Sequence, residues 1–333
     1  MSALDFVSER LATALGRAPT PGEDHVIVKI ERRAEVATVL RIGRETEAVV
    51  GVRRGAIRLD LSPLRGLHVD DTSLLVTVET GWPLQALEIE LGRRGLQLGP
   101  LPATSLERSV GAWLSAPRGS EAMPRVGPVA QLVYRVDALL ADGSELQTKG
   151  APRKAAGPEL WQLLVGTRGA LGVRLAATLR VERRAESRRE AAWEFADPLA
   201  AIAAARAILL DGTRPYELTL HAPALLTATF EAPTLLCEAQ QRHANQLATR
   251  LGGRPVPHQP PARYRNTPSE RTVPLDRLHT LAPLPKEARL VGWHLGGATL
   301  VDPARPYTPP LPSPIVAALK RRLDPSSYLP ELQ

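Results

Sequence analysis

The sequence predicts an α+β protein made of two domains. Segments that alternate apolar and polar residues, as strands do, are interleaved with segments whose apolar residues recur at helical spacing. The 333 residues exceed the ~100–200 residues typical of one domain. After a charged stretch at 182–190, the predicted elements follow the order β-α-β-β-α-β, which is typical of a ferredoxin-like sandwich.

The first domain is predicted to begin with a helix at 2–15, capped by Ser2, and a linker that ends at residue 22. Asp142-Gly143 predicts a hairpin turn, and long loops are expected at 95–111 and 117–128. The other predicted elements, in chain order, are a strand at 25–30, a helix at 34–42, strands at 48–52, 56–61 and 74–79, a helix at 83–91, strands at 132–140 and 145–148, a short helix at 160–164 and a half-buried strand at 173–181.

The second domain is predicted to follow the charged stretch. Asp197-Pro198 predicts the start of a helix, and Gly252-Gly253 predicts the end of another. Its predicted elements are strands at 191–195, 216–221, 226–230, 289–295 and 299–301, helices at 198–210 and 235–251, and a last helix at 315–323. Proline-rich loops are expected at 255–274 and 303–314. The predicted division of the chain is 1–22, 23–185, 186–302 and 303–333.

Composition excludes several classes of protein. The single Cys237 excludes an internal disulfide framework and a thiolate-rich metal site, and its place on an apolar helix face predicts a core residue. The seven histidines show no metal-ligand spacing, so no metal site is expected. No apolar run approaches the ~20 residues of a membrane helix. Without an apolar signal core either, a cytoplasmic location is expected.

The net charge of +7 raises nucleic-acid binding as one hypothesis. Arginines are spread along the chain, however, and aromatic residues make up only 4% of it, whereas nucleic-acid binders concentrate charge and interleave aromatic residues. We therefore favour a solvated, arginine-rich surface, with no nucleic-acid partner.

Glycines are the most informative residues. Gly166, Gly169 and Gly172 recur every third residue before a strand, a spacing that fits a tight turn or a loop whose amides approach a ligand. The surrounding run, 163–181, reads Leu-Leu-Val-Gly-Thr-Arg-Gly-Ala-Leu-Gly-Val-Arg-Leu-Ala-Ala-Thr-Leu-Arg-Val. It resembles the segment L-L-V-G-S-x-G-T-L-G-V-I-T-x-A-T-L-R-L of FAD-binding domains of the vanillyl-alcohol oxidase / p-cresol methylhydroxylase (PCMH-type) superfamily.

Further segments resemble motifs of the same superfamily in order and spacing. They are 59–64 (L-D-L-S-x-L), 76–81 (T-V-x-A-G), 109–112 (T-I-G-G), 127–133 (G-x-V-R-D-x-V), 140–143 (L-A-D-G) and, near the end, 319–325 (L-K-x-x-L-D-P). The total length and the short second domain most resemble the small FAD-binding subunit of bacterial glycolate oxidase. The resemblance implies a two-subdomain FAD-binding domain at 23–185, a small ferredoxin-like cap at 186–302, and a proline-rich segment and helix at 303–333 that return to the FAD domain.

The resemblance also implies a flavoprotein oxidoreductase that oxidises a small 2-hydroxy acid. FAD would lie between the two halves of its domain, under the cap. Electrons would pass to partner flavin and iron–sulfur subunits, because one cysteine cannot hold a cluster. The implied FAD contacts, many through backbone amides, are Gly81, Pro100, Thr104, Ser105, Val110, Gly111, Gly127, Val129, Gly172 and Val173.

Several motifs depart from the family pattern. The glycine-rich pyrophosphate loop, R-G-G-G-T-S and further small residues, is replaced by residues 51–58, a connection about ten residues shorter, in which Arg53, Arg54 and Gly55 are the candidate contacts. Ala112 replaces a glycine, the K-N-V-A-G-Y-D segment reads Arg-Lys-Ala-Ala-Gly-Pro-Glu at 153–159, and Tyr-Leu-Pro-Glu at 328–331 replaces a terminal N-P-G. An alternative function is therefore a degenerate, non-catalytic assembly or scaffold subunit without flavin.

No catalytic base is evident from the sequence. His294, on a predicted cap strand, is a candidate, with a half-buried structural histidine as the alternative. Arg263 and Arg265 could hold a substrate carboxylate bidentately, with solvated loop residues as the alternative.

Overall fold

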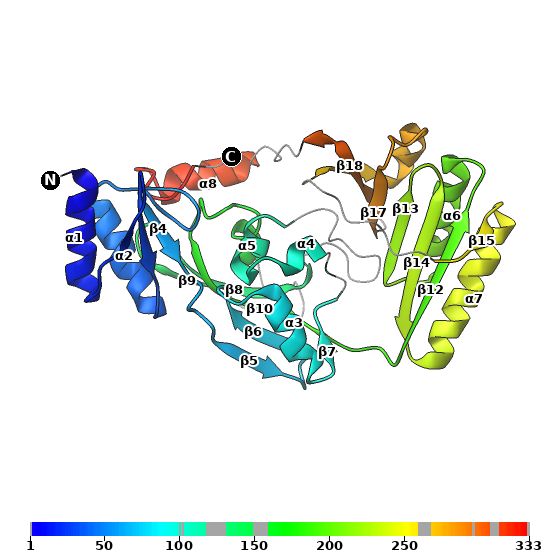
Figure 1. Ribbon diagram of the computed structural model, residues 1–333, viewed down its shortest axis with the longest axis horizontal. Helices are drawn as coiled ribbons and strands as arrows, with labels where there is room; N and C mark the ends of the chain where they lie inside the picture. Colours follow the sequence, from blue (N-terminus) through cyan, green and yellow to red (C-terminus); the bar gives the residue numbers. More distant parts are fainter. Residues whose placement is uncertain are drawn as a thin grey trace.

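A computed structural model of the chain describes residues 2–99, 101, 103–117, 131–148, 159–258, 268–294, 297–306 and 313–331. The molecule is elongated, with the N-terminal helices at one end and two helices of the second domain at the other (Figure 1). The described residues between them form four sheets, of four, five, two and seven strands, and this mixture of sheets and helices confirms the predicted α+β class.

The first layer is a small sheet with strand order β1-β2-β4-β3. Its strands are β1 (Thr20–Pro21), β2 (Val26–Lys29), β3 (Val50–Gly51) and β4 (Ile57–Asp60), and two helices, α1 (Ala3–Leu15) and α2 (Arg33–Glu45), pack in the same core. Ser2 caps α1, as the sequence predicts, by accepting a hydrogen bond from the Asp5 amide. Apolar residues at helical spacing, such as Val7 and Leu11, fill the core.

The second layer is an antiparallel sheet with strand order β5-β6-β10-β8-β9. Its strands are β5 (Leu67–Asp70), β6 (Leu75–Glu79), β8 (Val133–Leu139), β9 (Glu145–Gln147) and β10 (Val173–Arg180). The short segments that accompany it are α3 (Leu84–Gly92), β7 (Leu96–Gln97), α4 (Ala103–Leu106), α5 (Val110–Ser115), a 3-10 turn η4 (Leu160–Leu163) and β11 (Glu182–Arg183). The long loop expected at 95–111 is therefore wrong, because short apolar runs there form β7, α4 and the start of α5. The loop expected at 117–128 lies, after residue 117, outside the described residues. Strand β5 was not predicted, because this edge strand leaves His68 exposed and carries few apolar residues.

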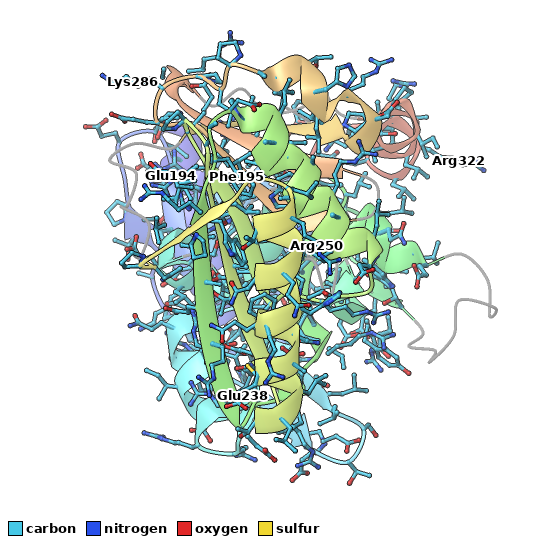
Figure 2. All side chains as sticks on the ribbon, turned by 90° about the vertical axis from the view of Figure 1, so that its right-hand side faces the viewer. Glu194, Phe195, Glu238, Arg250, Lys286 and Arg322 are labelled. Carbon is cyan, nitrogen blue, oxygen red and sulfur yellow. The ribbon has the colours of Figure 1, made fainter. Side chains whose placement is uncertain are left out.

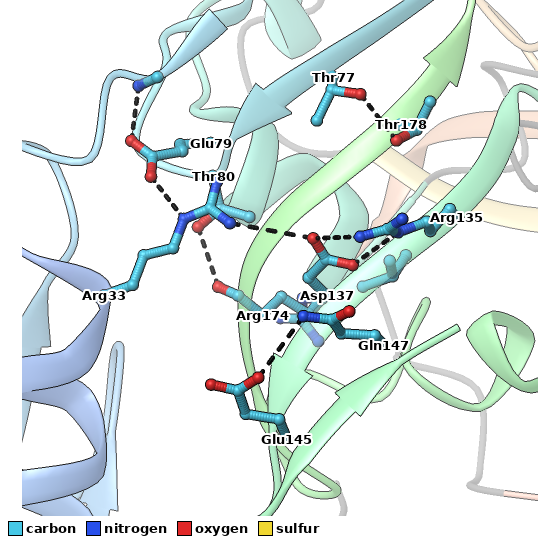
Figure 3. A network of polar contacts seen from close by, with 12 residues as sticks. Arg33, Thr77, Glu79, Thr80, Arg135, Asp137, Glu145, Gln147, Arg174 and Thr178 are labelled. Atoms are coloured by element: carbon cyan, nitrogen blue, oxygen red, sulfur yellow. Dashed lines mark hydrogen bonds and ion pairs between the residues drawn. The ribbon is translucent and has the colours of Figure 1, made fainter. Parts of the chain in front are cut away.

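The two layers are joined by charge as well as by apolar packing. The Arg33 guanidinium, at the start of α2, donates from Nε to Glu79 at 2.6 Å and lies 3.9 Å from Asp137 (Figure 3). Val173 and Leu175 of β10 belong to the same core cluster as the first layer. The end of β6 and the start of β10 therefore lie at the junction of the layers.

The cap domain is built on a seven-stranded antiparallel sheet with order β15-β12-β14-β13-β17-β18-β16. Its elements are β12 (Ser187–Glu194), α6 (Pro198–Leu210), β13 (Glu217–His221), β14 (Leu225–Ala232), α7 (Thr234–Arg250), β15 (Arg254–Val256), β16 (Pro268–Pro274), a 3-10 turn η5 (Leu275–Leu281), β17 (Arg289–His294) and β18 (Gly297–Pro306). Helices α6 and α7 cover the outer face of the sheet (Figures 1 and 2). Cys237 is fully buried there, as predicted.

The β-α-β-β-α-β order is correct, but the last strand of that unit was assigned to the wrong residues. It is β15, which pairs with β12 and overlaps the start of the proline-rich loop expected at 255–274. The end of that expected loop is also wrong, because Pro268–Pro274 forms strand β16 and pairs with β18. Pro255 is tolerated there because β15 is an edge strand, where a missing N–H breaks no ladder. The charged stretch at 182–190 likewise contains the first half of β12, whose alternate side chains face away from the helices.

The last helix, α8 (Pro314–Leu323), packs with Val316 and Leu319 against the second layer. The residues after it continue to the first layer, where the Val50 amide donates to the Tyr328 carbonyl at 2.7 Å. Among the described residues, no helix is both long and apolar enough to cross a membrane.

Candidate functional site

The β3–β4 connection, where Arg53, Arg54 and Gly55 were predicted to contact a pyrophosphate, is a tight turn of five residues. Both arginines are exposed. Gly55 has a φ of +111°, and a Cβ there would lie 2.5 Å from the Val49 carbonyl oxygen. On the other side, a Cβ at Gly51 would lie 2.6 Å from Pro330 of the C-terminal tail. The chain itself therefore fills the space around these glycines, and the two arginine side chains lie at the exposed surface.

Gly81 follows the end of strand β6, at the point where the two layers meet. A Cβ on this residue would collide with the carbonyl oxygen of Leu61 and would lie 2.6 Å from that of Leu64. The backbone of the second layer therefore rests directly on the turn that follows β4. Glycine is required here because the two layers approach so closely.

Replacing Gly81 by alanine is expected to lower the free energy of unfolding by about 1–3 kcal/mol, because the added methyl group overpacks a rigid backbone contact. Denaturant unfolding of the purified variant measures this change. Gly92→Ala is the matched control: its Cβ would lie 3.4 Å from its nearest neighbour, an Arg184 guanidinium nitrogen, so stability should be unchanged or slightly higher. Equal stability of Gly81→Ala and Gly92→Ala would contradict the close approach.

Helix α5 carries the next group of predicted contacts. The amides of Val110 and Gly111 donate to the carbonyls of Trp82 and Thr80, at 2.8 and 2.9 Å, and the Ser109 hydroxyl caps the helix by accepting from the Ala112 amide. Ser105 is fully buried. Thr104 lies on α4, but its side chain is outside the described set. Pro100, Gly127 and Val129 also lie outside the described residues. These contacts remain predictions.

The glycine-rich run before β10 packs against the end of α5. The amides of Gly166 and Arg168 donate to the carbonyls of Leu114 and Ser115, at 2.9 and 3.1 Å. Gly166 and Gly169 have φ values of +81° and +91°, so glycine is favoured at both turns. Gly172, where a Cβ would lie 2.8 Å from the Leu139 carbonyl oxygen, leads into Val173 and β10. The tight-turn interpretation thus accounts for these glycines.

Three of the predicted contact segments meet at Thr80 and Arg174. The Thr80 hydroxyl donates to the Arg174 carbonyl at 2.9 Å (Figure 3), and the Thr80 carbonyl accepts from Gly111. The Arg174 guanidinium donates to the Leu164 carbonyl at 2.8 Å and to the Ser115 hydroxyl. The end of β6, helix α5 and the glycine-rich run are therefore brought together, as a single site requires.

The cap contributes a polar sheet face that the sequence analysis did not identify. Leu218 and Leu220 point into the core under the helices, so Glu217, Thr219 and His221 lie on the opposite face. Cross-strand pairing continues this face onto Thr227 and Thr229 of β14 and onto Arg289 of β17. Because α6 and α7 cover the outer side, this polar face is turned toward the first two layers (Figure 1).

His221 has the most perturbed ionisation on this face. Its Nε2 lies 3.1 Å from the Thr227 hydroxyl, which itself lies 3.3 Å from the Thr219 carbonyl. Because a hydroxyl has one proton to donate, and Thr227 directs it to Thr219, we assign the imidazole proton to Nε2. Burial lowers the pKa of His221 to about 4, and the charges of Arg289 and His258 act in the same direction. The ring is therefore neutral at pH 7, with an unprotonated Nδ1.

The structure does not show whether the catalytic candidates from the sequence lie near this polar face. His294 lies on β17, but its side chain is outside the described set, as are Arg263 and Arg265 entirely. The alternating pattern Glu-Leu-Thr-Leu-His at 217–221 could have indicated His221, because it places the histidine with the polar residues of the strand. A separate hollow of about 300 Å³ lies between α1 and α2, beside Phe6 and Arg10, and involves none of these residues.

The residues present fit a flavin dinucleotide in a modified form. The five-residue turn does not offer the amides of a glycine-rich loop, and the amides of Val110 and Gly111 are already engaged. The buried Arg174, in contrast, has an Nε with no hydrogen-bond partner among the described residues. Fixed positive charge thus stands where the end of β6, helix α5 and the glycine-rich run converge.

Comparison with known proteins agrees with this arrangement. The sequence profile of the family described as FAD binding domain matches residues 25–149. A D-lactate dehydrogenase of Archaeoglobus fulgidus is 28% identical over 178 residues, which are 49% of this chain and 40% of that protein. A mitochondrial D-lactate dehydrogenase [cytochrome] of Arabidopsis thaliana is 28% identical over 225 residues, which are 60% of this chain and 38% of that protein. The chain therefore spans less than half the length of either relative.

Two solved structures share the fold over nearly the whole chain. An alkyldihydroxyacetonephosphate synthase superposes with a TM-score of 0.70, covering 93% of this chain and 76% of that one, at 15% identity. A p-cresol methylhydroxylase with substrate bound superposes with a TM-score of 0.68, covering 98% of this chain and 86% of that one, at 12% identity. By sequence, residues 25–149 match an FAD binding domain, and over nearly its whole length the chain has the fold of p-cresol methylhydroxylase and alkyldihydroxyacetonephosphate synthase.

Proposed function

We propose that this chain is an FAD-linked oxidoreductase that oxidises a small 2-hydroxy acid. The observation that carries the proposal is the polar face of the cap sheet, where a neutral His221 is paired in register with Arg289 and turned toward the FAD-binding domain. A 2-hydroxy acid presents a carboxylate, which suits a guanidinium, and a hydroxyl proton, which suits an unprotonated imidazole nitrogen. FAD, when bound, supplies the electron acceptor for such an oxidation.

The names of relatives support this substrate class, since they include D-lactate dehydrogenases. Within the proposal, Arg174 and the segments around Gly81, Gly111 and Gly172 would hold the cofactor. The guanidinium of Arg289 would bind the substrate carboxylate. His221 would accept the hydroxyl proton at Nδ1. Glycolate as substrate, partner flavin and iron–sulfur subunits as electron acceptors, and a cytoplasmic location remain part of the proposal.

A visible absorption spectrum tests cofactor retention. We expect the purified protein, incubated with FAD and passed through a desalting column, to elute with the absorption bands of an oxidised flavin. Heat-denatured protein treated in the same way is the control for carry-over. Protein that elutes without colour after incubation with excess FAD would contradict the proposal.

A non-catalytic assembly subunit is the second candidate. It is favoured by one observation, the five-residue β3–β4 turn, which is packed against the C-terminal tail at Pro330. The colourless outcome of the flavin experiment is the result this second candidate predicts.

A further inference from the structure

Arg174 is an arginine buried inside the FAD-binding domain. It is 5% exposed, and it lies on β10 between the core residues Val173 and Leu175. Its hydrogen-bond partners are neutral: the Leu164 carbonyl and the Ser115 hydroxyl. Among the described residues, its Nε has no acceptor and no carboxylate pairs with it.

A buried guanidinium without an anion is costly, because neutral acceptors replace only part of its hydration. Desolvation lowers the pKa of Arg174 to about 10, which still leaves it charged at pH 7. The superfamily segment that residues 163–181 resemble, L-G-V-I-T, has an isoleucine at this position. The charge is therefore an addition in this chain to a site that an apolar residue could fill.

The location of Arg174 indicates what neutralises it. Its carbonyl is held by Thr80, next to Gly81, and its guanidinium joins the end of α5 to Leu164 at the start of the glycine-rich run. These are the three segments predicted to contact the dinucleotide. The same domain has lost the long loop whose amides would have neutralised a diphosphate, and the arginines of the short turn lie at the exposed surface.

We propose that Arg174 supplies the positive charge that binds the diphosphate of a flavin dinucleotide, in place of the amides of a glycine-rich loop. This inference rests on the proposed function. A diphosphate is the anion that this chemistry suits, because a guanidinium binds phosphate oxygens through several parallel N–H donors.

Binding of FAD, riboflavin and inorganic pyrophosphate to the full chain tests the proposal, measured by isothermal calorimetry and by the shift of the unfolding temperature. For Arg174→Met we expect a Kd for FAD raised at least about 30-fold, as for truncation of one partner of a buried charge pair. Riboflavin, which lacks the diphosphate, should bind both proteins alike. Pyrophosphate should raise the unfolding temperature of the original chain and not that of the variant.

Two further variants separate charge from hydrogen bonding. Arg174→Gln can still donate to Leu164 or Ser115 but carries no charge, so it should fold and lose FAD affinity as the methionine variant does. Arg180→Met removes an exposed arginine from the end of the same strand and should bind FAD like the original chain.

The outcomes distinguish this inference from the proposed function. If the original chain and Arg174→Gln bind FAD equally well, Arg174 is only a structural link and the inference is overturned, while the flavin function stands. If the original chain binds no FAD but pyrophosphate stabilises it in an Arg174-dependent manner, the flavin function fails and the anion site stands. No response to either ligand overturns both.

Discussion

Replacing His221 by asparagine is expected to lower kcat for oxidation of a 2-hydroxy acid by about 10²–10⁴-fold, the usual contribution of a general base. The reason is the neutral imidazole on the polar face of the cap, whose Nε2 proton is directed to Thr227 and whose Nδ1 is unprotonated. Asparagine can keep the contact with Thr227 but cannot accept a proton. Steady-state rates with D-lactate and glycolate, using an artificial electron acceptor, measure the effect.

The lowered pKa of His221 determines how activity and stability should change with pH. A base with a pKa of about 4 is active above that pH, so activity should fall on the acid side near pH 4 rather than near 6.5, the ordinary value for histidine. Between these two values the unfolded chain binds a proton that the folded chain does not, so stability should rise with pH across that window. In the His221→Asn variant, this contribution to the rise of stability with pH should be absent.

The control is His243→Asn, which replaces a half-exposed histidine on α7 that contacts Asp211. It should leave kcat unchanged. A rate for His221→Asn within a few-fold of the original, with flavin bound, would remove His221 from the proposed reaction and leave the oxidoreductase function to another base.

Replacing Lys320 by methionine is expected to lower the free energy of unfolding by about 3–5 kcal/mol, because it leaves a buried carboxylate without its partner. The Lys320 and Asp324 side chains are 4% and 1% exposed, and they form an ion pair one turn apart in α8 and its C-cap. Lys320 also donates to the Leu329 carbonyl at 2.8 Å. Asp324 accepts from the amides of Tyr328 and Leu329, at 2.9 and 2.8 Å.

This network fixes the C-terminal tail against the first layer. Leu329 is buried in the core of that layer, and the Tyr328 carbonyl accepts from Val50 on the edge strand β3. Loss of Lys320 should therefore loosen the tail and expose the β3–β4 turn. Hydrogen exchange of the Val50 amide, followed beside denaturant unfolding, reports both effects.

The double variant Lys320→Met/Asp324→Leu should recover part of the lost stability, since an apolar pair leaves no unpaired charge. Arg322→Met, on the exposed side of the same helix (Figure 2), should change stability by less than about 0.5 kcal/mol. If Lys320→Met and Arg322→Met change the free energy of unfolding by equally small amounts, the buried ion pair does not stabilise the tail.

Local pattern in the sequence was sufficient for most elements of the fold. The apolar residues at 173–181 predicted a strand, and Asp197-Pro198 predicted the start of α6, because both signals are carried by neighbouring residues. The prediction of a half-buried strand was wrong, because residues 173–179 are buried on both faces between the packed layers. Strands β5, β15 and β16 were missed because edge strands need few apolar residues and tolerate proline. Their existence depends on the partner strand rather than on their own composition.

The candidate site was less accessible to sequence reasoning. The resemblance singled out residues 163–181 and 319–325, yet gave no role to Arg174, Lys320 or Asp324. An arginine in an alternating strand gives no indication of whether solvent or a packed helix faces it. His221 was likewise unremarkable, because the periodicity of β13 shows that it shares a face with Thr219 but not what lies opposite that face.

By itself, the sequence determined the α+β class, the FAD binding domain at residues 25–149, the order of elements in the cap and the shortness of the β3–β4 connection. These depend on residue periodicity, capping and spacing, which act over a few positions. The tertiary structure decided that two layers touch at Gly81 and that Lys320 and Asp324 anchor the tail. It also decided that Arg174 is buried without a carboxylate partner among the described residues, and that His221 is neutral. Each of these features depends on contacts between segments that are distant in the chain. Only the folded protein determines how far a charged group is buried and therefore how well water solvates it.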